Sequence, residues 1–176
     1  MGLSIAISGI IVLMTLVNLM MTIFALASAT SNSTTRILSD RSSIENLSLN
    51  TITRIESIQA VANDAQVLIV LNNTGSTKLW SYDNFDVIVT YDANMTGTKV
   101  RVTEELTYAG ITNTIPPGKW GITQFMGDLL DPQIVNPSEK VELKCTLLNV
   151  IYPNGVLSAI VSTDAGAVAT KSVVVV

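Results

Sequence analysis

The sequence contains no histidine and a single cysteine, and only 14 % of its 176 residues are charged. The absence of histidine excludes Ser-His-Asp and Cys-His catalysis and the usual histidine-containing zinc sites. One cysteine cannot form an internal disulfide. The net charge of −4 offers no basic surface to phosphate backbones, so we expect no nucleic-acid partner. The length allows one compact domain, alone or with an appendage.

Charge is also absent from the first 35 residues, and Leu3–Ala29 is a run of 27 uncharged, mostly apolar residues. As a helix it would be roughly 40 Å long, more than the ~30 Å hydrocarbon core of a membrane requires. No basic segment precedes it, and it is longer than a secretory signal core. We therefore expect residues 1–29 to form an uncleaved membrane anchor. Cleavage after the alternating alanines at 25, 27 and 29 is the alternative.

A few polar residues interrupt this apolar run. The expected behaviour of serine and threonine is a hydrogen bond back to their own helix. Asn18 lies near the centre of the run, where an amide is harder to satisfy, so it is a candidate for helix self-association. The positions considered for interhelical hydrogen bonds are Ser4, Ser8, Thr15, Asn18 and Thr22.

The chain becomes polar from Thr30, but isolated aliphatic residues continue with spacings of seven, three, eight and three. Such spacings indicate one stripe on a helix. We expect one continuous helix from about 3 to 60, with residues 30–61 as a stalk. An apolar stripe without a neighbouring domain predicts helix bundling into a homo-oligomer; packing back on the following domain is the alternative. The stripe consists of Ile37, Ile44, Leu47, Ile55 and Ile58.

Residues 62–176 change to a period of two and are rich in β-branched residues, with turn signals between the runs. Six or seven short strands in this length predict an antiparallel, immunoglobulin-like β-sandwich, and an α+β class for the whole chain. The alternation around Cys145 places its side chain in the core, as a small inert hydrophobe. The expected strands lie in 65–73, 85–92, 98–108, 140–152, 156–163 and 167–176.

Carboxylates are the remaining candidates for chemistry. Glu104 and Glu105 are adjacent in a strand and point to opposite faces, so they cannot converge on one site. The aspartates at 83, 86 and 92 lack the spacing of a calcium loop, and we expect them to cap turns. No phosphate loop or nucleophile elbow is present. We expect no enzyme activity, no cofactor, no metal site and no small-molecule substrate.

The orientation across the membrane has two opposing indications. Arg36 and Arg41 follow the apolar run and favour a cytoplasmic C-terminal part. Four N-glycosylation acceptor sequences favour an exterior one. We expect the exterior orientation. The acceptors are Asn32, Asn46, Asn72 and Asn94.

The chain starts Met1-Gly2-Leu3-Ser4, runs straight into the apolar helix, and later contains Asn73–Trp80 (NTGSTKLW) and Phe85–Tyr91 (FDVIVTY). In these features it resembles the archaeal flagella-related proteins F and G, the accessory stator proteins of the archaellum. The resemblance implies a helix in the membrane and a sandwich outside the cell. It also implies partners among archaellum proteins and the surface layer (S-layer). In that family the sandwich holds the rotary motor against the surface layer and so supports motility.

Archaellins and archaeal type IV pilins share this layout and are the alternative, with the helix in a filament core instead of lipid. Their precursors carry a basic leader, and many retain a glutamate near the mature start. Only Met1 and Gly2 precede the apolar run, without Lys or Arg, and the first glutamate is Glu45. We therefore expect either an unprocessed accessory protein or a leader missing from the sequence. A generic membrane-anchored surface protein would need an aromatic or charged cleft, and aromatics make up only 5 %.

Overall fold

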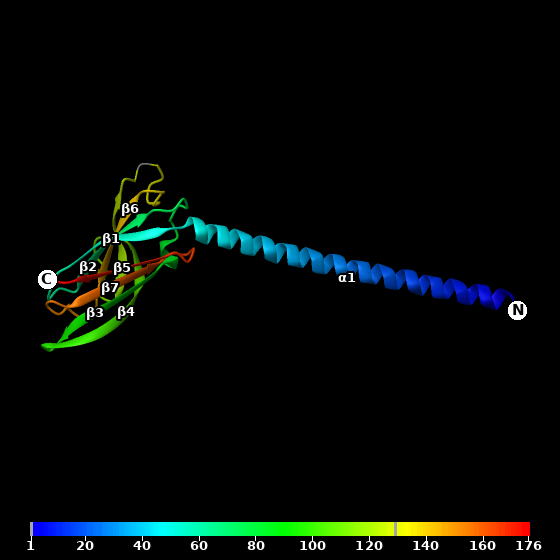
Figure 1. The fold of residues 1–176 in the computed structure, drawn as a ribbon, viewed down its shortest axis with the longest axis horizontal. Coiled ribbons are helices and arrows are strands. Elements are labelled where there is room, and N and C mark those ends of the chain that lie inside the picture. The colour runs from blue at the N-terminus through cyan, green and yellow to red at the C-terminus, as the bar shows by residue number, and fades with distance from the viewer. Residues whose placement is uncertain (1, 129) are drawn as a thin grey trace. The chain divides into compact units, whose positions relative to one another are not determined.

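The computed structural model describes residues 2–128 and 130–176, with the backbone alone at helix positions 2–8, 29, 31–34, 37, 38, 40 and 44. The chain divides into two compact units, Met1–Glu45 and Asn46–Val176. Helix α1 runs from Gly2 to Asn50, so its last turn belongs to the second unit (Figure 1). The second unit is otherwise built from strands.

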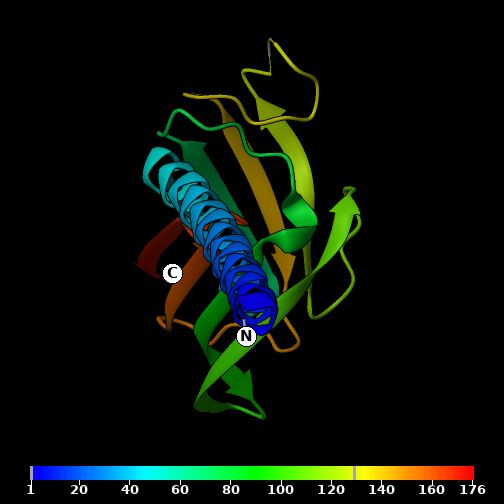
Figure 2. The same cartoon turned by 90° about the vertical axis from the view of Figure 1, so that its right-hand side faces the viewer.

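Eight strands form one hydrogen-bonded order, β1-β2-β6-β5-β4-β3-β7-β8, and a short 3-10 helix, η1, precedes β3. The β3–β4 hairpin and the β5–β6 connection extend from opposite ends of this unit (Figures 1 and 2). The order bends over one core, which confirms the predicted β-sandwich. The bounds are β1 Thr53–Ala60, β2 Gln66–Asn73, η1 Tyr82–Asn84, β3 Asp86–Met95, β4 Thr98–Ile111, β5 Lys119–Met126, β6 Lys140–Thr146, β7 Val156–Ser162 and β8 Val168–Val174.

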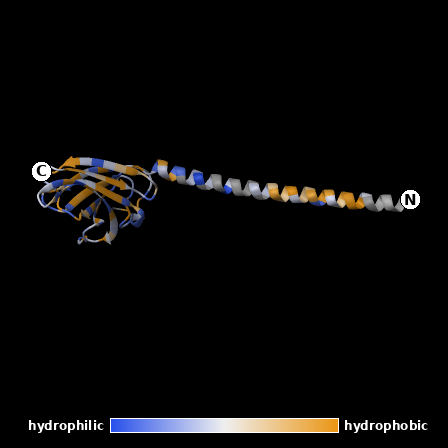
Figure 3. Ribbon diagram, turned by 90° about the horizontal axis from the view of Figure 1, so that it is seen from below, coloured by the Kyte–Doolittle hydropathy of each residue, from blue (hydrophilic) through white to orange (hydrophobic). Residues whose placement is uncertain are grey.

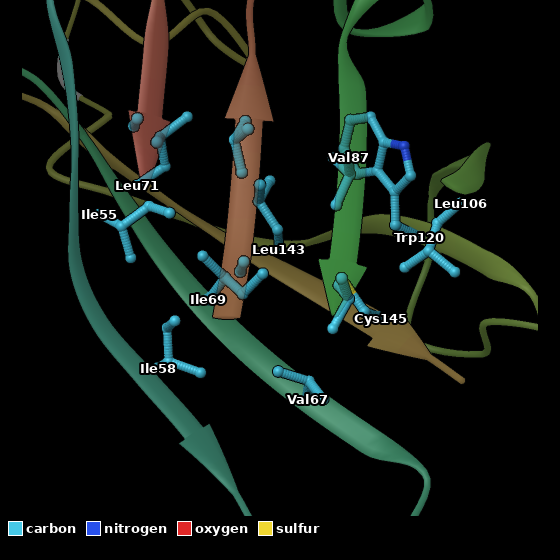
Figure 4. Packing of buried hydrophobic residues seen from close by; sticks show 14 of the residues in the cluster. Ile55, Ile58, Val67, Ile69, Leu71, Val87, Leu106, Trp120, Leu143 and Cys145 are labelled. Carbon is cyan, nitrogen blue, oxygen red and sulfur yellow. The ribbon is translucent and has the colours of Figure 1, made fainter. Parts of the chain in front are cut away.

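The core is a single cluster supplied by alternating positions of the strands. Val141, Leu143 and Cys145 of β6 are buried while their strand neighbours are partly exposed, as the sequence pattern predicts. Trp120 of β5 is fully buried and lies against Tyr108, with the two ring centroids 4.7 Å apart. Figure 4 shows Leu143, Cys145 and Trp120 among the buried side chains that lie between the strands. Burial of the aliphatic and aromatic groups is the main stabilising contribution to the domain.

One pair of strands departs from the predicted antiparallel pattern. The first part of β4 pairs with β3, and its end pairs in parallel with β5, from Thr107 opposite Lys119 to Ile111 opposite Ile122. The strands approach closely because Gly121 lacks a side chain: a Cβ there would lie 2.6 Å from the carbonyl oxygen of Gly110. Long strand β4 thereby links the two faces of the sandwich.

The prediction of a helix continuing to about residue 60 is wrong, and so are the predicted boundaries of the stalk at 61 and of the sandwich at 62. Residues 53–60 form strand β1. Its pairing with β2 shifts between Ile55 and Ser57, which is a β-bulge. The bulge inserts one residue, so Ile55 and Ile58 both point into the core despite their spacing of three (Figure 4). A bulged strand therefore imitates the helical spacing.

The helix ends at Asn50 because the chain meets partners there that a continued helix could not use. The hydroxyl of Thr51 donates to the carbonyl of Leu47 at 2.7 Å, and the amide of Asn50 donates to the carbonyl of Asn46 at 2.8 Å. The carbonyl of Leu47 also accepts the N–H of Thr51, at 3.0 Å, which is the last helical bond. The carbonyl of Asn50, which a continued helix would use itself, instead accepts the N–H groups of Ser76 and Thr77 at 2.9 and 3.3 Å. The β-branched residues Thr51, Ile52 and Thr53 then favour extended backbone.

Candidate interaction surfaces

The apolar part of α1 is long enough to cross a membrane. Gly9–Ser28 has a mean hydropathy of 2.5, and none of these side chains is buried. Twenty residues at 1.5 Å each span about 30 Å, the thickness of the hydrocarbon core. Figure 3 shows the apolar stretch of α1 in orange, in contrast with the alternating colours of the strands.

Two threonines of this segment behave as predicted. The hydroxyl of Thr15 donates to the carbonyl of Val12 at 2.8 Å, and that of Thr22 donates to the carbonyl of Asn18 at 2.7 Å. The predicted positions Ser4 and Ser8 lie outside the described side chains. The side chain of Asn18 is exposed at the middle of the segment, and among the described residues it has no hydrogen-bond partner. An amide in this position is costly in lipid unless another molecule pairs with it.

The stripe predicted for helix self-association is divided by the structure. Leu47 is 47 % exposed on the last part of the helix. Ile55 and Ile58 belong to the core of the sandwich, so their assignment to a helix interface is wrong. The side chains of Ile37 and Ile44 lie outside the described residues. The remaining predicted helix positions, Asn18, Ile37, Ile44 and Leu47, stay a prediction.

The start of the β domain holds the end of the helix through the turn after β2. The backbone N–H groups of Ser76 and Thr77 donate to the carbonyl of Asn50, at 2.9 and 3.3 Å. Those of Thr74 and Gly75 donate to the carbonyl of Ile52, at 2.8 and 2.9 Å. We call these residues, Asn50, Ile52 and Thr74–Thr77, the helix-end clamp. It provides four backbone hydrogen bonds at the point where the chain enters the sandwich.

Glycine is required in this clamp for a steric reason. A Cβ at Gly75 would fall well inside van der Waals contact with the carbonyl oxygen of Asn50 and the nitrogen of Ile52. Both are backbone atoms, so no side-chain rotation can relieve the contact. Asn73-Thr74-Gly75 is a turn signal in the sequence, but no local pattern pairs that turn with the end of the helix.

The four glycosylation acceptors have different surroundings. Asn46 is exposed on the last part of α1, and Asn32 lies outside the described side chains. Asn94 is partly buried: its amide donates to Asn63 Oδ1 at 3.3 Å, and its Oδ1 accepts from the N–H of Gly97 at 3.0 Å. Asn72 lies in β2 between β1 and β6, and its buried Oδ1 has no hydrogen-bond partner among the described residues. Asn46 is therefore the most accessible of the three described acceptors.

Two large apolar side chains are exposed on neighbouring loops. Trp80 is 66 % exposed and Leu130 is 77 % exposed. Their loops are joined by the backbone bridge of Leu79 with Val135 and by the ion pair of Lys78 with Asp131 at 2.5 Å. Exposed tryptophan is characteristic of protein contacts.

An ion-pair centre organises the base of the β3–β4 hairpin. The carboxylate of Asp92 is only 8 % exposed; it pairs with Lys99 at 2.9 Å and Arg101 at 2.9 Å, and accepts the N–H of Val156 at 2.8 Å. Burial alone would raise the pKa of Asp92, but the bonds from Lys99, Val156 and Arg101 outweigh it and hold that pKa well below its ordinary value. Asp92 thus joins β3 and β4 to the start of β7, a role beyond the turn capping predicted for it.

A second polar centre lies inside the sandwich. The hydroxyl of Tyr91 donates to Glu104 at 2.5 Å, and the carboxylate of Glu104 also accepts the N–H of Leu148, at 3.1 Å. The N–H of Asn149 donates to the hydroxyl of Tyr91 at 3.2 Å. Burial and this bond to Glu104 raise the pKa of Tyr91 to about 12. Tyr91 and Glu104 thus hold the segment after β6 in place, and these structural hydrogen bonds engage their polar groups.

The candidate reactive groups of the sequence have structural surroundings. Cys145 is completely buried, and burial raises the pKa of its thiol to about 12, so the reactive thiolate is suppressed. Among the described residues, no three His, Cys, Asp or Glu side chains gather in the manner of a metal site. The surfaces that remain are the apolar helix, the exposed loops and the ends of the sheet.

Comparison with solved structures identifies the fold. The chain is similar to the subunit of the archaeal flagellum of Methanospirillum hungatei, at 11 % identity and a TM-score of 0.63, over 96 % of this chain and 92 % of that one. It is also similar to archaeal flagellin FlaB1 from Methanocaldococcus jannaschii (14 %, TM-score 0.52, 71 % and 90 %). The archaellum periplasmic stator protein complex FlaF and FlaG from Sulfolobus acidocaldarius gives 16 % identity and a TM-score of 0.48, over 69 % and 87 %.

No curated protein matches the sequence. Residues 49–172, however, match the family described as conserved flagellar protein F, immunoglobulin-like domain. This match covers the clamp, all eight strands apart from the end of β8, and all of the core cluster except Val175. It confirms both the predicted immunoglobulin-like sandwich and the predicted family resemblance: the chain belongs to the conserved flagellar protein F family.

Proposed function

We propose that the chain is a non-enzymatic accessory protein, a stator, of the archaellum. The segment Gly9–Ser28 anchors it in the membrane, and the sandwich lies outside, where it contacts S-layer or other archaellum proteins. The observation that carries the proposal is the flagellar protein F domain over residues 49–172, in a chain whose apolar helix has the length of a membrane span. A stator needs a membrane anchor and an exterior contact domain; it needs no catalytic group.

The helix-end clamp supports a mechanical role. A protein that holds a rotating machine against the envelope must transmit force from its anchor to its contact surface. Four backbone hydrogen bonds tie Asn50 and Ile52 to the turn at Thr74–Thr77, so force on the end of the helix is distributed into β2. A connecting loop without these hydrogen bonds would extend under the same force.

Self-association through the anchor is part of the proposal. The amide of Asn18 lies at the middle of the apolar segment, and an equivalent amide on a second helix would satisfy it, for about 0.6–2 kcal/mol. We propose dimers or small assemblies formed by residues 9–28, with Leu47 and the stripe positions Ile37 and Ile44 extending the contact. Glycosylation on the exterior part would occur at Asn46 in preference to Asn72, because Asn46 is exposed.

The alternative is a filament subunit, which the likeness to the Methanospirillum hungatei flagellum favours at the level of fold. Two measurements distinguish a stator from a filament subunit. Deletion of a stator abolishes swimming while filaments without this chain remain visible by electron microscopy. Long filaments built from this chain would overturn the stator proposal.

Self-association through the apolar segment is tested by Asn18→Leu in the full chain in detergent. Thr22→Leu is the matched control, because the Thr22 hydroxyl is already bonded within its own helix. We expect Asn18→Leu to shift the assembly to monomer and Thr22→Leu to leave it unchanged. Equal behaviour of the two variants would remove Asn18 from the interface.

A further inference from the structure

The two ends of the sheet leave a groove between them. Strands β1 and β8 terminate the strand order, and each has only one hydrogen-bonded neighbour, β2 and β7 respectively. The two strands lie next to each other. At the middle of the seam Lys171 donates from Nζ to the carbonyl oxygen of Glu56, at the β1 bulge. Beyond this bridge no ladder joins the two strands in the described part of the chain.

The groove lies past the bridge, toward the C-terminal ends of both strands, and has a volume of about 520 Å³. Because Lys171 lies beside Glu56 and the residues after each of them line the groove together, β1 and β8 run in the same direction. Its walls are mostly aliphatic, and Asp64 is the one charged side chain among the lining residues. The larger apolar side chains of the lining are Ile58, Val61, Leu68, Val173, Val174 and Val176.

We infer that this groove binds an extended segment of a partner protein, which adds a strand to the open seam. Unpaired N–H and C=O groups of an edge strand are satisfied by another strand, whereas a lipid chain or an apolar small molecule would leave them open. The valine-rich end of β8 has the side chains that favour such pairing. Four residues on each side, 58–61 and 173–176, correspond to about 13 Å of strand. The partner segment is therefore short, β-branched, and uncharged or with one basic residue facing Asp64.

A second copy of this chain is a poorer occupant. Antiparallel pairing of two β8 strands about their centre places Lys171 opposite Lys171, and like charges directly opposite are destabilising. Pairing along β1 meets the bulge and the covering Lys171 side chain, both of which protect an edge, so the partner strand pairs with the end of β8 beyond the bridge. The strand donor is therefore a different protein. This inference rests on the proposed function, since it assigns a surface to the exterior contact of a stator.

The chain offers a matched pair of variants for the test. Val168 and Val174 are the first and last residues of β8, they are 60 % and 61 % exposed, and their spacing of six places them on the same face. Only Val174 lines the groove. Val174→Asp introduces a charge into the binding surface, and Val168→Asp introduces the same charge at the other end of the strand.

The experiment uses the full chain in lipid nanodiscs and two probes. The first is an acetylated eight-residue peptide of alternating valine and threonine with one lysine, and the second is a purified S-layer preparation. We expect the peptide to bind with micromolar affinity and to slow amide hydrogen exchange at residues 172–176 at least tenfold. Val174→Asp should weaken peptide binding at least tenfold, and Val168→Asp less than twofold.

The outcomes separate this inference from the proposed function. If the peptide does not bind, or binds both variants equally, the groove is not a strand site, whatever the S-layer result. If the peptide binds as expected and the S-layer preparation does not, the groove inference stands and the S-layer contact fails. If Val174→Asp alters self-association of the chain instead of peptide binding, the occupant is a second copy and the inference is overturned.

Discussion

Replacement of Gly75 by alanine tests whether the helix-end clamp stabilises the entry of the chain into the sandwich. The added methyl group would overlap the carbonyl oxygen of Asn50 and the nitrogen of Ile52. Because both are backbone atoms, the turn at Thr74–Thr77 must move away from the end of the helix. Gly75 does not have a positive φ, so the effect of alanine is the steric overlap and not backbone strain.

The magnitude follows from the hydrogen bonds that the displaced turn would lose. Four backbone bonds reach Asn50 and Ile52 from this turn. At a net 0.5–1.5 kcal/mol each, their complete loss would lower the free energy of unfolding by roughly 2–6 kcal/mol. We expect a value near the lower end, about 2 kcal/mol, because a small shift of the turn can preserve some of the bonds.

The matched control is Thr74→Ala in the same turn. It removes one exposed hydroxyl bond, from Thr74 Oγ1 to the carbonyl of Ile52 at 3.2 Å, and leaves the backbone contacts intact. We expect a loss below about 1 kcal/mol. Urea unfolding of the full chain in nanodiscs, followed by the fluorescence of buried Trp120, measures the domain as a whole. Amide hydrogen exchange at residues 74–77 measures the clamp itself.

Gly75→Ala should raise the exchange rates of these four amides, and Thr74→Ala should leave them near those of the parent chain. A Gly75→Ala variant with unchanged exchange and a stability within about 0.5 kcal/mol of the parent would refute the clamp. A stability loss without faster exchange at 74–77 would place the effect elsewhere in the domain.

Four further results are expected. Asp92→Asn should lower the free energy of unfolding by about 2 kcal/mol at pH 7, as measured by urea titration, because Lys99 and Arg101 lose their partner. This difference should shrink as the pH falls below about 4, because the stabilisation from a lowered folded-state pKa is complete above the unfolded pKa and is lost as the pH falls toward the folded pKa; a constant difference down to pH 2 would contradict it. Ile55→Asp should abolish folding of the sandwich by circular dichroism while Leu47→Asp preserves it, because only Ile55 lies in the core. Cys145 should resist iodoacetamide in the folded chain and react in urea; rapid labelling of the native chain would contradict its burial.

Periodicity predicts the core of this domain well where strands are regular. The buried positions of β6 and the positions of β2, β3, β7 and β8 follow from alternation alone, because side chains of a strand point to opposite faces in turn. Strand β5 is missed because Gly121 and Gln124 dilute its pattern, and because its close approach to Gly110 is a property of the folded pair. Asp92 and Glu104 also bond the N–H groups of Val156 and Leu148, which are distant in sequence, so no local pattern indicates these centres.

The helix predicted over residues 53–60 is a strand whose β-bulge imitates helical spacing. A spacing of three between Ile55 and Ile58 is a helical signal only if the backbone is regular, and the bulge at Glu56 produces the same spacing in a strand. Local composition carried the contrary signal, since Asn50-Thr51-Ile52-Thr53 combines a poor helix former with three β-branched residues. The bulge also frees the carbonyl of Glu56 to accept Lys171 across the seam. The feature that obscured β1 in the sequence is thus the one that bridges the two ends of the sheet and sets where the groove begins.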